Sequence, residues 1–297
     1  MISMLALSPA VDVTYELDAL AAGGINRPSR TTKVAGGKAL NAARVARALG
    51  ADVRATVALG GATGEWIRRR LEVDDVPATV IALAAETRTC LALVEADGGA
   101  SSTDVYEHAT DLSSEEWGLF AEAVGAAPVA RWTAVSGSIP PGVPPAELAA
   151  LLSALRAGGS RVAVDTSGAA LAHLAAHSDL VKVNRAEASE LLDREMPDAA
   201  SACRGLHEQF GVDAVVTDGI RGGAALYAGE LHPLAPPRAI GRFPAGSGDA
   251  FFGGLLAGLD GGAPFTAALA GARDAAERNA QVPGQGVLAP FSHFRIA

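Results

Sequence analysis

The stretch Gly246-Ser247-Gly248-Asp249-Ala250-Phe251-Phe252-Gly253-Gly254-Leu255-Leu256-Ala257-Gly258-Leu259 joins a small turn to an apolar run. The run predicts a buried helix, and the turn marks the start of that helix. A helix N-terminus carries unpaired N–H groups and a partial positive charge, and glycines let an anion approach the backbone. Asp249 at the joint therefore has two interpretations: a carboxylate that caps the helix, or a base beside a phosphoryl group. The stretch alone leaves both open.

The composition is that of one α/β domain. A chain of 297 residues, 49% hydrophobic and only 5% aromatic, can bury a large core of small aliphatic side chains. The net charge of −9 argues against non-specific binding to nucleic acid or to an anionic membrane surface. Cys90 and Cys203 lie far apart without metal-ligand spacing, which favours a reduced, cytoplasmic setting. No apolar run is long enough to cross a bilayer. The segment Met1–Asp12 lacks the basic start and the long apolar region of a signal peptide.

The second half of the chain alternates between predicted strands and helices. The strands fall at Trp132–Val135, Arg161–Asp165, Leu180–Val183 and Ala214–Thr217, and helices such as Pro144–Ala157 and Ala199–Phe210 separate them. This rhythm predicts a mostly parallel central sheet with helices on both faces. Ligands of such sheets bind beyond the carboxyl ends of the strands.

Four further strands, at Val13–Leu17, Arg30–Val34, Thr89–Glu95 and Thr103–Glu107, lack helices in the same rhythm. We expect them to form a separate small sheet, from about 12–35 and 88–108, that acts as a lid within a single domain spanning 1–297. A lid excludes water and completes a site. Its apolar face would be exposed in a lone chain, so we expect two lids to pair in a homodimer.

A second glycine-led helix starts at Gly36-Gly37-Lys38 and ends at Gly50. Lys38 and Asn41 are three residues apart and share one face of its first turn, which suits a polar or anionic ligand. A solvated helix start is the alternative, and the stretch is not a phosphate-binding P-loop. Farther on, Gly60–Gly64 is predicted to be a loop before a helix over Glu65–Leu71.

Other polar residues have two interpretations each. Asp12 follows the first strand, Ser3–Leu7, and is either a ligand group or a turn aspartate. Arg88 either binds an anion or is an ordinary surface arginine. His173 and His177 are four residues apart on a predicted helix, but no third metal ligand is near them.

Four short motifs occur in order: Gly36-Gly37-Lys38-x-x-Asn41, Asn184-x-x-Glu187, Thr217-x-Gly219-x-x-Gly222 and Gly246-Ser247-Gly248-Asp249. Each is weak alone, but together they resemble the ribokinase (PfkB) family of carbohydrate kinases over essentially the whole chain. Three further segments, together with Asp12 after Ser-Pro-Ala, resemble the branch that phosphorylates sugar phosphates, namely 1-phosphofructokinase and tagatose-6-phosphate kinase. These segments are Asn26-Arg27, Thr87-Arg88 and residues 136–142.

The resemblance implies a ribokinase-like three-layer α/β/α fold with a small β-sheet lid. It implies ATP-dependent phosphorylation of a hydroxyl on a sugar phosphate of the fructose 1-phosphate or tagatose 6-phosphate type. Asp249 would be the general base, and the backbone of Gly246, Ser247 and Gly248 would form the anion hole. The implied cofactors are ATP and Mg²⁺, with Glu187 reaching the metal through water.

The remaining roles are also implied by the resemblance. The acceptor-side residues would be Asp12, Arg27, Gly36, Gly37, Lys38, Asn41, Arg88 and Ser136. The nucleotide-side residues would be Lys182, Asn184, Glu187, Thr217, Gly219, Gly222 and Asn279.

The chain departs from the branch pattern on the acceptor side. Cys90 and Ala92 stand where Asn and Lys are usual, and Ser8 stands where Asn is common. Glu107 would repel a phosphate if it pointed inward. A kinase of the same fold for an unphosphorylated sugar or a nucleoside is therefore the alternative. A sugar-binding regulator without activity would have no need of Asp249 beside an anion hole, and a dinucleotide-binding oxidoreductase would need a G-x-G-x-x-G turn after a strand.

Overall fold

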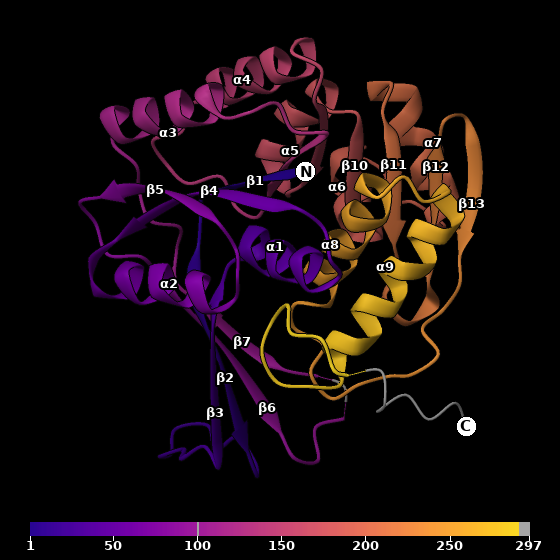
Figure 1. Ribbon diagram of the computed structural model, residues 1–297. Coiled ribbons are helices and arrows are strands. Elements are labelled where there is room, and N and C mark those ends of the chain that lie inside the picture. Colours follow the sequence, from indigo (N-terminus) through magenta and orange to yellow (C-terminus); the bar gives the residue numbers. More distant parts are fainter. Residues whose placement is uncertain (100, 291–297) are drawn as a thin grey trace.

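The computed structural model describes residues 1–99 and 101–290 and contains two sheets (Figure 1). The larger sheet has nine strands in the order β13-β12-β11-β10-β9-β8-β1-β4-β5. Their bounds are β1 (Ile2–Ala6), β4 (Val53–Gly60), β5 (Ala78–Leu83), β8 (Trp132–Ser136), β9 (Arg161–Asp165), β10 (Leu180–Asn184), β11 (Asp213–Thr217), β12 (Gly223–Tyr227) and β13 (Glu230–Leu234). All neighbours pair in parallel except β11–β12 and β12–β13, which form the antiparallel edge. The predicted, mostly parallel α/β sheet is confirmed.

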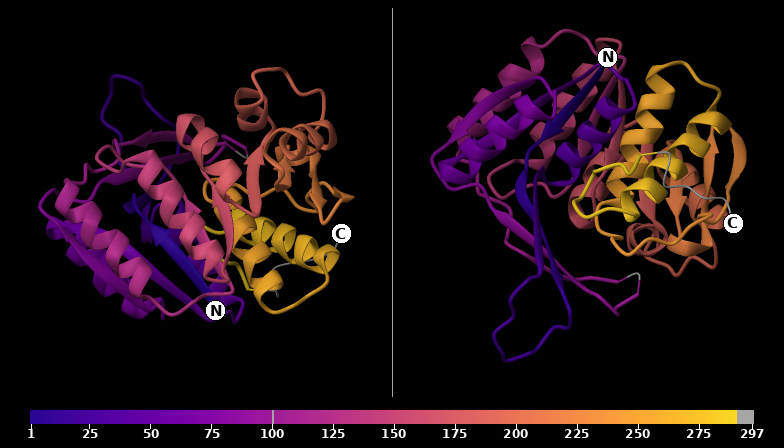
Figure 2. Two further views of the ribbon diagram at one scale, coloured as in Figure 1. Left: turned by 90° about the horizontal axis from the view of Figure 1, so that it is seen from above. Right: turned by 60° about the horizontal axis from the view of Figure 1, so that its bottom comes forward.

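Helices cover both faces of this sheet, as the figures show (Figures 1 and 2). One face carries α1 (Lys38–Ala48), α2 (Gly61–Val73), α8 (Ser247–Asp260) and α9 (Phe265–Ala280). The other carries α3 (Ser114–Ala126), α4 (Pro145–Ala157), α5 (Gly168–Leu174), α6 (Arg185–Leu191) and α7 (Ala199–Phe210).

Each face has its own hydrophobic core because successive strand residues point in opposite directions. In β1, Ile2, Met4 and Ala6 pack into the core under α1 and α8. Leu5, and Leu7 just after the strand, pack into the core under the other set of helices. The strands therefore read as continuous apolar runs, as expected when both faces of a sheet are buried.

The smaller sheet has the order β3-β2-β6-β7 and projects from the body of the molecule (Figure 2, right). Its strands are β2 (Ala10–Leu17), β3 (Arg30–Gly36), β6 (Thr89–Glu95) and β7 (Thr103–Tyr106). They match the four strands that the sequence predicts for the lid. Strands β2 and β3 follow β1 directly in the chain and lead into the start of α1. The small sheet is therefore joined to the main body next to the N-terminus of α1.

One predicted loop is wrong. The helix expected from Glu65 begins already at Gly61, within the predicted loop Gly60–Gly64. The first turn of α2 is satisfied by Glu86, which accepts hydrogen bonds from the Thr63 N–H at 2.7 Å and from the Thr63 hydroxyl at 2.5 Å. This cap comes from a distant segment, so the local sequence contains no sign of it.

Within residues 1–99 and 101–290, no helix is both long and apolar enough to cross a bilayer.

Candidate active site

The carboxyl ends of adjacent parallel strands bring four polar residues to one edge of the large sheet. The last residues of β8, β9, β10 and β11 are Ser136, Asp165, Asn184 and Thr217, respectively. Strand pairing places Ser136 beside Asp165 and Asn184 beside Thr217. Helices α1 and α8 pack side by side on one face of the sheet (Figure 1), and a hydrogen bond from Asn41 to Asp249 joins their first turns. Residues from distant parts of the chain therefore meet at one place.

Asp249 lies in the first turn of α8 but does not cap it. The N-cap is Gly246, at φ 80°, and no side chain caps this helix. The Asp249 side chain instead accepts a hydrogen bond from Asn41 Nδ2 at 3.0 Å, and Asp249 is only 8% exposed. Of the two interpretations that the sequence leaves open, the capping one is excluded.

The environment of Asp249 makes it a stronger base than an ordinary carboxylate. Burial raises its pKa to about 6, against the opposing effect of the Lys38 ammonium. A carboxyl group with this pKa remains largely ionised near neutral pH and accepts a proton more readily than a surface aspartate.

Asn41 connects Asp249 to a second buried carboxylate. Its Nδ2 also donates to Asp12 Oδ2 at 3.0 Å, and the Gly37 N–H donates to the same oxygen at 3.2 Å. A Cβ on Gly36 would lie 2.1 Å from Asp12 Cγ, so only glycine fits there. Burial raises the pKa of Asp12. The predicted residues Asp12, Gly36, Gly37 and Asn41 are thus brought together with Asp249.

Two lysines share one carboxylate, that of Asp165. Lys182 Nζ donates to its Oδ2 at 3.1 Å, and Lys38 Nζ lies 3.5 Å from its Oδ1. Burial disfavours the Asp165 anion, but the two ammonium groups outweigh burial and lower its pKa, and Asp165 in turn raises the pKa of Lys38. The group stays ionised and holds two positive charges at the site.

The start of α8 offers donors to an anion, although not every donor that the sequence predicts. The Ser247 N–H is already bonded to Pro244 O at 3.1 Å. Among residues 1–99 and 101–290, the N–H groups of Gly246, Gly248 and Asp249 have no acceptor. A Cβ on Gly248 would lie 3.2 Å from Lys182 Nζ, so this lysine adds its charge beside those free donors.

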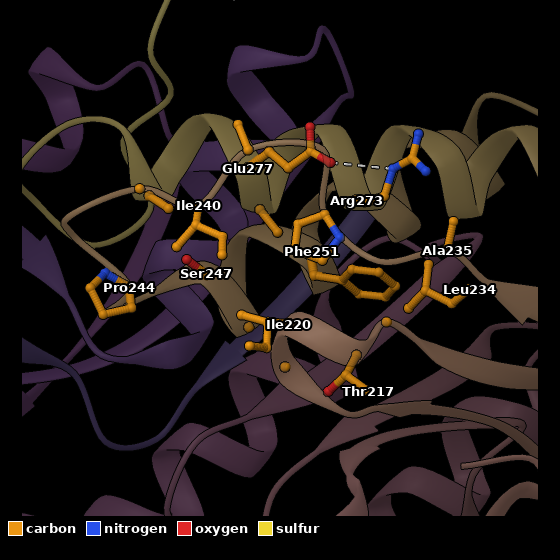
Figure 3. Close-up of a pocket in the computed structure, with 18 residues that line it drawn as sticks. Thr217, Ile220, Leu234, Ala235, Ile240, Pro244, Ser247, Phe251, Arg273 and Glu277 are labelled. Carbon is orange, nitrogen blue, oxygen red and sulfur yellow. Dashed lines mark ion pairs between the residues drawn. The ribbon is translucent and has the colours of Figure 1, made fainter. Parts of the chain in front are cut away.

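A cavity of about 310 Å³ opens next to the α8 N-terminus (Figure 3). Thr217, Gly219 and Gly222 line it, as do Ser247 and Gly248 at the start of α8. The rest of its wall is mainly apolar and includes Ile220, Leu234, Ala235, Pro237, Ala239, Ile240, Pro244, Phe251, Ala276 and Ala280. An ion pair on α9, between Arg273 and Glu277 at 3.4 Å, also lines the cavity.

The pattern of the pfkB family of carbohydrate kinases matches residues 6–290. The chain belongs to this family. It is a sugar kinase, and its large, mostly parallel sheet and its smaller sheet match those of the ribokinase-like fold.

Solved structures support the same assignment. Phosphofructokinase-2 from Escherichia coli in complex with substrates and products is 25% identical, with a TM-score of 0.90 over 98% of this chain and 96% of that one. The complex of the same enzyme with fructose-6-phosphate is 26% identical, with a TM-score of 0.85 over 93% and 92%. A possible 1-phosphofructokinase from Thermotoga maritima shares the fold, at 19% identity and a TM-score of 0.83 over 98% and 95%.

In this pfkB kinase, Asn184 and Glu187 form a reciprocal cap of α6. The Glu187 N–H donates to Asn184 Oδ1 at 2.8 Å, and the Asn184 N–H donates to Glu187 Oε2 at 2.8 Å. Glu187 Oε1 keeps its lone pairs for a water or a metal. No group of three potential metal-ligand side chains occurs in the described part of the chain, which includes His173 and His177. One free carboxylate oxygen fits Mg²⁺, which commonly keeps its waters and arrives with nucleotide phosphates.

Asn279, which the resemblance implies on the nucleotide side, lies behind the turn that precedes α8. It is fully buried, and its amide donates to Ala245 O at 2.9 Å and to Ser247 Oγ at 3.2 Å. Its Oδ1 accepts from the Gly286 N–H at 2.7 Å. Its amide nitrogen and its amide oxygen together join the turn before α8 to the segment after α9.

Three further residues are predicted on the acceptor side, namely Arg88, Ser136 and Arg27. Arg88 donates to Ser8 O at 3.2 Å and to Glu107 O at 3.0 Å, and its Nε is buried without a partner in the described chain. Ser136 Oγ is likewise buried and unpartnered there. Arg27 is exposed in the loop between β2 and β3. Since Asp12 pairs with Val34 and that hairpin continues for several residues before the loop, the structure does not bring Arg27 to its own chain's Asp12.

Asp165 is a site residue that was not predicted from the sequence, where it is only the end of a predicted strand. The signal was available, because it ends β9 at the same edge where Ser136 and Asn184 end their strands.

Proposed function

We propose that this kinase transfers the γ-phosphoryl group of ATP to a hydroxyl of a sugar phosphate of the fructose 1-phosphate or tagatose 6-phosphate type. One observation carries the proposal. Asp249, a buried carboxylate with a raised pKa, lies in the same helical turn as the free Gly248 N–H, and Lys182 lies beside Gly248. A base and an anion site so close together suit the removal of a proton from a hydroxyl that attacks a phosphoryl group.

In the proposed reaction, Asp249 accepts the proton of the acceptor hydroxyl as that oxygen attacks the γ-phosphorus. The bond from the γ-phosphorus to the bridging oxygen breaks, and ADP leaves with its electron pair. The Gly248 N–H and the Lys182 ammonium stabilise the charge on the transferred group, and the fixed geometry lowers the entropic barrier. Glu187 would hold Mg²⁺ through water, and that ion would neutralise nucleotide phosphate charge.

The nucleotide would occupy the cavity beside α8, with its base against the apolar wall and its phosphates directed toward Gly248. Thr217, Gly219 and Gly222 are then on the nucleotide side. Gly222 has φ 84°, and a Cβ there would lie 2.2 Å from Leu234 O, so this position requires glycine to shape the cavity wall.

The acceptor would lie between Asp12 and Asp249, where Asn41 aligns both carboxylates. A phosphate on the acceptor is supported by Lys38, which is 38% exposed, and by the unpartnered Nε of Arg88. Glu107 Oε2 accepts a hydrogen bond from the Thr89 N–H at 2.8 Å, which holds this carboxylate against the backbone of β6. The phosphofructokinase-2 neighbour binds fructose-6-phosphate, which supports a phosphorylated ketohexose.

A second candidate is a kinase for an unphosphorylated sugar or a nucleoside. It is favoured by the two carbonyl hydrogen bonds that already engage the Arg88 guanidinium, and by small side chains, Cys90 and Ala92, on the buried face of β6.

An ATP-consumption screen separates the two candidates. Fructose 1-phosphate, fructose 6-phosphate and tagatose 6-phosphate are compared with the free hexoses and with nucleosides. We expect kcat/KM at least 100-fold higher for one of the phosphorylated sugars. Turnover of free hexoses or nucleosides alone would contradict the sugar-phosphate kinase and support the kinase for an unphosphorylated acceptor.

The proposal includes a homodimer formed through the lid and a cytoplasmic location. Val105 on β7 is 53% exposed, and packing of a second lid against its face of the small sheet would cover it. Cys90 and Cys203 are free thiols, which suits a reducing compartment. Analytical ultracentrifugation of wild type and Val105→Asp tests the dimer: a monomeric wild type would contradict it.

A further inference from the structure

Arg44 lies one helical turn after Asn41 in α1, and its side chain is only 11% exposed. Its guanidinium meets oxygen acceptors from four segments of the chain. Nε donates to Asp74 Oδ2 at 2.9 Å, and Nη1 donates to Gln285 O at 2.7 Å and to Asn41 Oδ1 at 3.3 Å. Nη2 donates to Ala35 O, at the end of β3. This density of contacts makes Arg44 a junction between α1, β3, the end of α2 and the segment after α9.

The chemistry of a guanidinium determines which end of the Asn41 amide faces it. Arginine has donors only and stays charged, so its neighbour must present an acceptor. Asn41 therefore turns Oδ1 toward Arg44, and both hydrogens of Nδ2 face the carboxylates of Asp12 and Asp249. The opposite orientation would set Nδ2 against the guanidinium and Oδ1 against two carboxylates, leaving buried polar groups unpaired.

We propose that Arg44 is a positioning residue for phosphoryl transfer: it holds the Asn41 amide in the one orientation that donates to Asp249. The inference rests on the proposed function, because it assigns Asp249 as the base. Arg44 does not touch the reacting atoms and acts through Asn41.

The same guanidinium also fixes the segment that supports the anion site. A Cβ on Gly246 would lie 2.7 Å from Gln285 Cα, so the residue whose carbonyl Arg44 holds packs directly on the turn before α8. A Cβ on Gly286 would lie 3.0 Å from Arg44 Nη1 and 2.8 Å from Asn41 Cα. The Arg44 side chain therefore contacts both Asn41, which binds the base, and the segment that packs on the turn with the free N–H groups.

The groups that face Asp249 determine the sign of the expected pH effect. Lys38 and Lys182 favour its anion, Asp165 opposes it, and the Asn41 hydrogen bond favours it. Loss of Arg44 releases the Asn41 amide and removes its contribution, while the other three groups stay. The pKa of Asp249 should then rise, which moves the acid limb of kcat/KM to higher pH.

The test compares Arg44→Met with Arg47→Met in the full chain. Arg47 lies one helical turn after Arg44 in α1. It pairs with Asp75 at 2.5 Å, next to the Asp74 that pairs with Arg44. For Arg44→Met we expect kcat to fall on the order of 10²-fold, the KM for ATP to stay within about twofold, and the acid limb to move up by about half a pH unit or more. Arg47→Met should match wild type in all three. Arg44→Lys, which keeps a donor, should recover part of kcat.

A purely structural role for Arg44 would give a different result. Arg44→Met would then lose thermal stability, while folded enzyme assayed at low temperature would keep the wild-type kcat and pH profile, and that result overturns the inference. If Arg44→Met does not fold, Asp74→Asn removes the anchor of the guanidinium and is measured in the same way.

A crystal structure of the variant gives a readout that does not depend on activity. We expect Asn41 Nδ2 to leave hydrogen-bond distance of Asp249 in Arg44→Met. An unchanged contact overturns the inference even if no acceptor is turned over by wild type. A wild type inert with every acceptor, or an active Asp249→Asn, would instead overturn the proposed function.

Discussion

Asn41 Nδ2 lies 3.0 Å from Asp249 Oδ2, which joins the first turn of α1 to the first turn of α8 across 208 positions of sequence. The same nitrogen lies 3.0 Å from Asp12 Oδ2. One amide therefore sets the distance between the base and the acceptor side.

The pH dependence of turnover should report Asp249. Its pKa is raised to about 6, and the proposed base must be ionised, so kcat/KM should fall about tenfold per pH unit below pH 6. Circular dichroism over the same range would show that the fold persists. A flat profile down to pH 5 would contradict this assignment.

The ionised Asp249 side chain should also lower the free energy of unfolding at pH values above its pKa. Its folded pKa exceeds the ordinary value of 3.8, so the folded state binds more protons than the unfolded state between about pH 4 and 6, and stability falls as the pH rises through that window. Asp249→Asn should therefore raise the free energy of unfolding at pH 8 by up to about 3 kcal/mol. Urea unfolding at pH 4 and pH 8 measures this. A variant less stable than wild type at pH 8 would show that the carboxylate stabilises the fold.

Asp165→Asn should damage both folding and turnover, because Lys38 and Lys182 would repel each other without the shared anion. Removing one partner of a buried ion pair costs about 3 kcal/mol or more, and kcat should fall on the order of 10²-fold as Lys182 leaves Gly248. Glu72→Gln, which removes an exposed ion pair with Arg68, is the control and should change stability by less than about 1 kcal/mol. Equal effects of the two substitutions would argue against the role of Asp165.

Gly37→Ala should disturb the acceptor side. Gly37 has φ 86°, and a Cβ there would lie 2.7 Å from Ser8 O, so the backbone must shift and the Gly37 N–H must leave Asp12. We expect kcat/KM for the acceptor to fall at least tenfold. Gly50→Ala is the matched control, since Gly50 has φ 90° with nothing within 4 Å. It should lower stability by about 1 kcal/mol and leave the kinetics unchanged. Identical kinetics for both variants would contradict the assignment.

Ala276→Phe should reduce nucleotide affinity. Ala276 lines the cavity beside α8, and a phenyl ring there would occupy space that the base requires. The KM for ATP should rise at least tenfold while kcat changes little. Ala270→Phe, on the exposed side of the same helix α9, should behave as wild type. Unchanged ATP affinity in Ala276→Phe would place the nucleotide elsewhere.

Most of the fold could be predicted from the sequence because its signals are local. Apolar runs ending in polar residues predict the parallel strands, and Ala199–Phe210 is a helix with the predicted bounds. The start of α2 was not predictable in this way. Its first turn is satisfied by Glu86, more than twenty positions along the chain, and no local residue marks it.

The site shows the same division between local and distant information. The glycine-led turns predict where α1 and α8 begin, and the structure brings Asp12, Asn41 and Asp249 into contact. The significance of Asp165 depends on lysines from β10 and α1, which only the folded chain brings together. The resemblance implies Asn279 on the nucleotide side, and its hydrogen-bond partners in two other segments are brought to it only by the fold.

The most direct test of the central claim is the turnover of Asp249→Asn with the acceptor that the screen identifies. Asn keeps the shape of the side chain and cannot take the proton. We predict that kcat falls by about 10³-fold or more while calorimetry finds ATP binding within about threefold of wild type. Turnover within tenfold of wild type would contradict the assignment of Asp249 as the base.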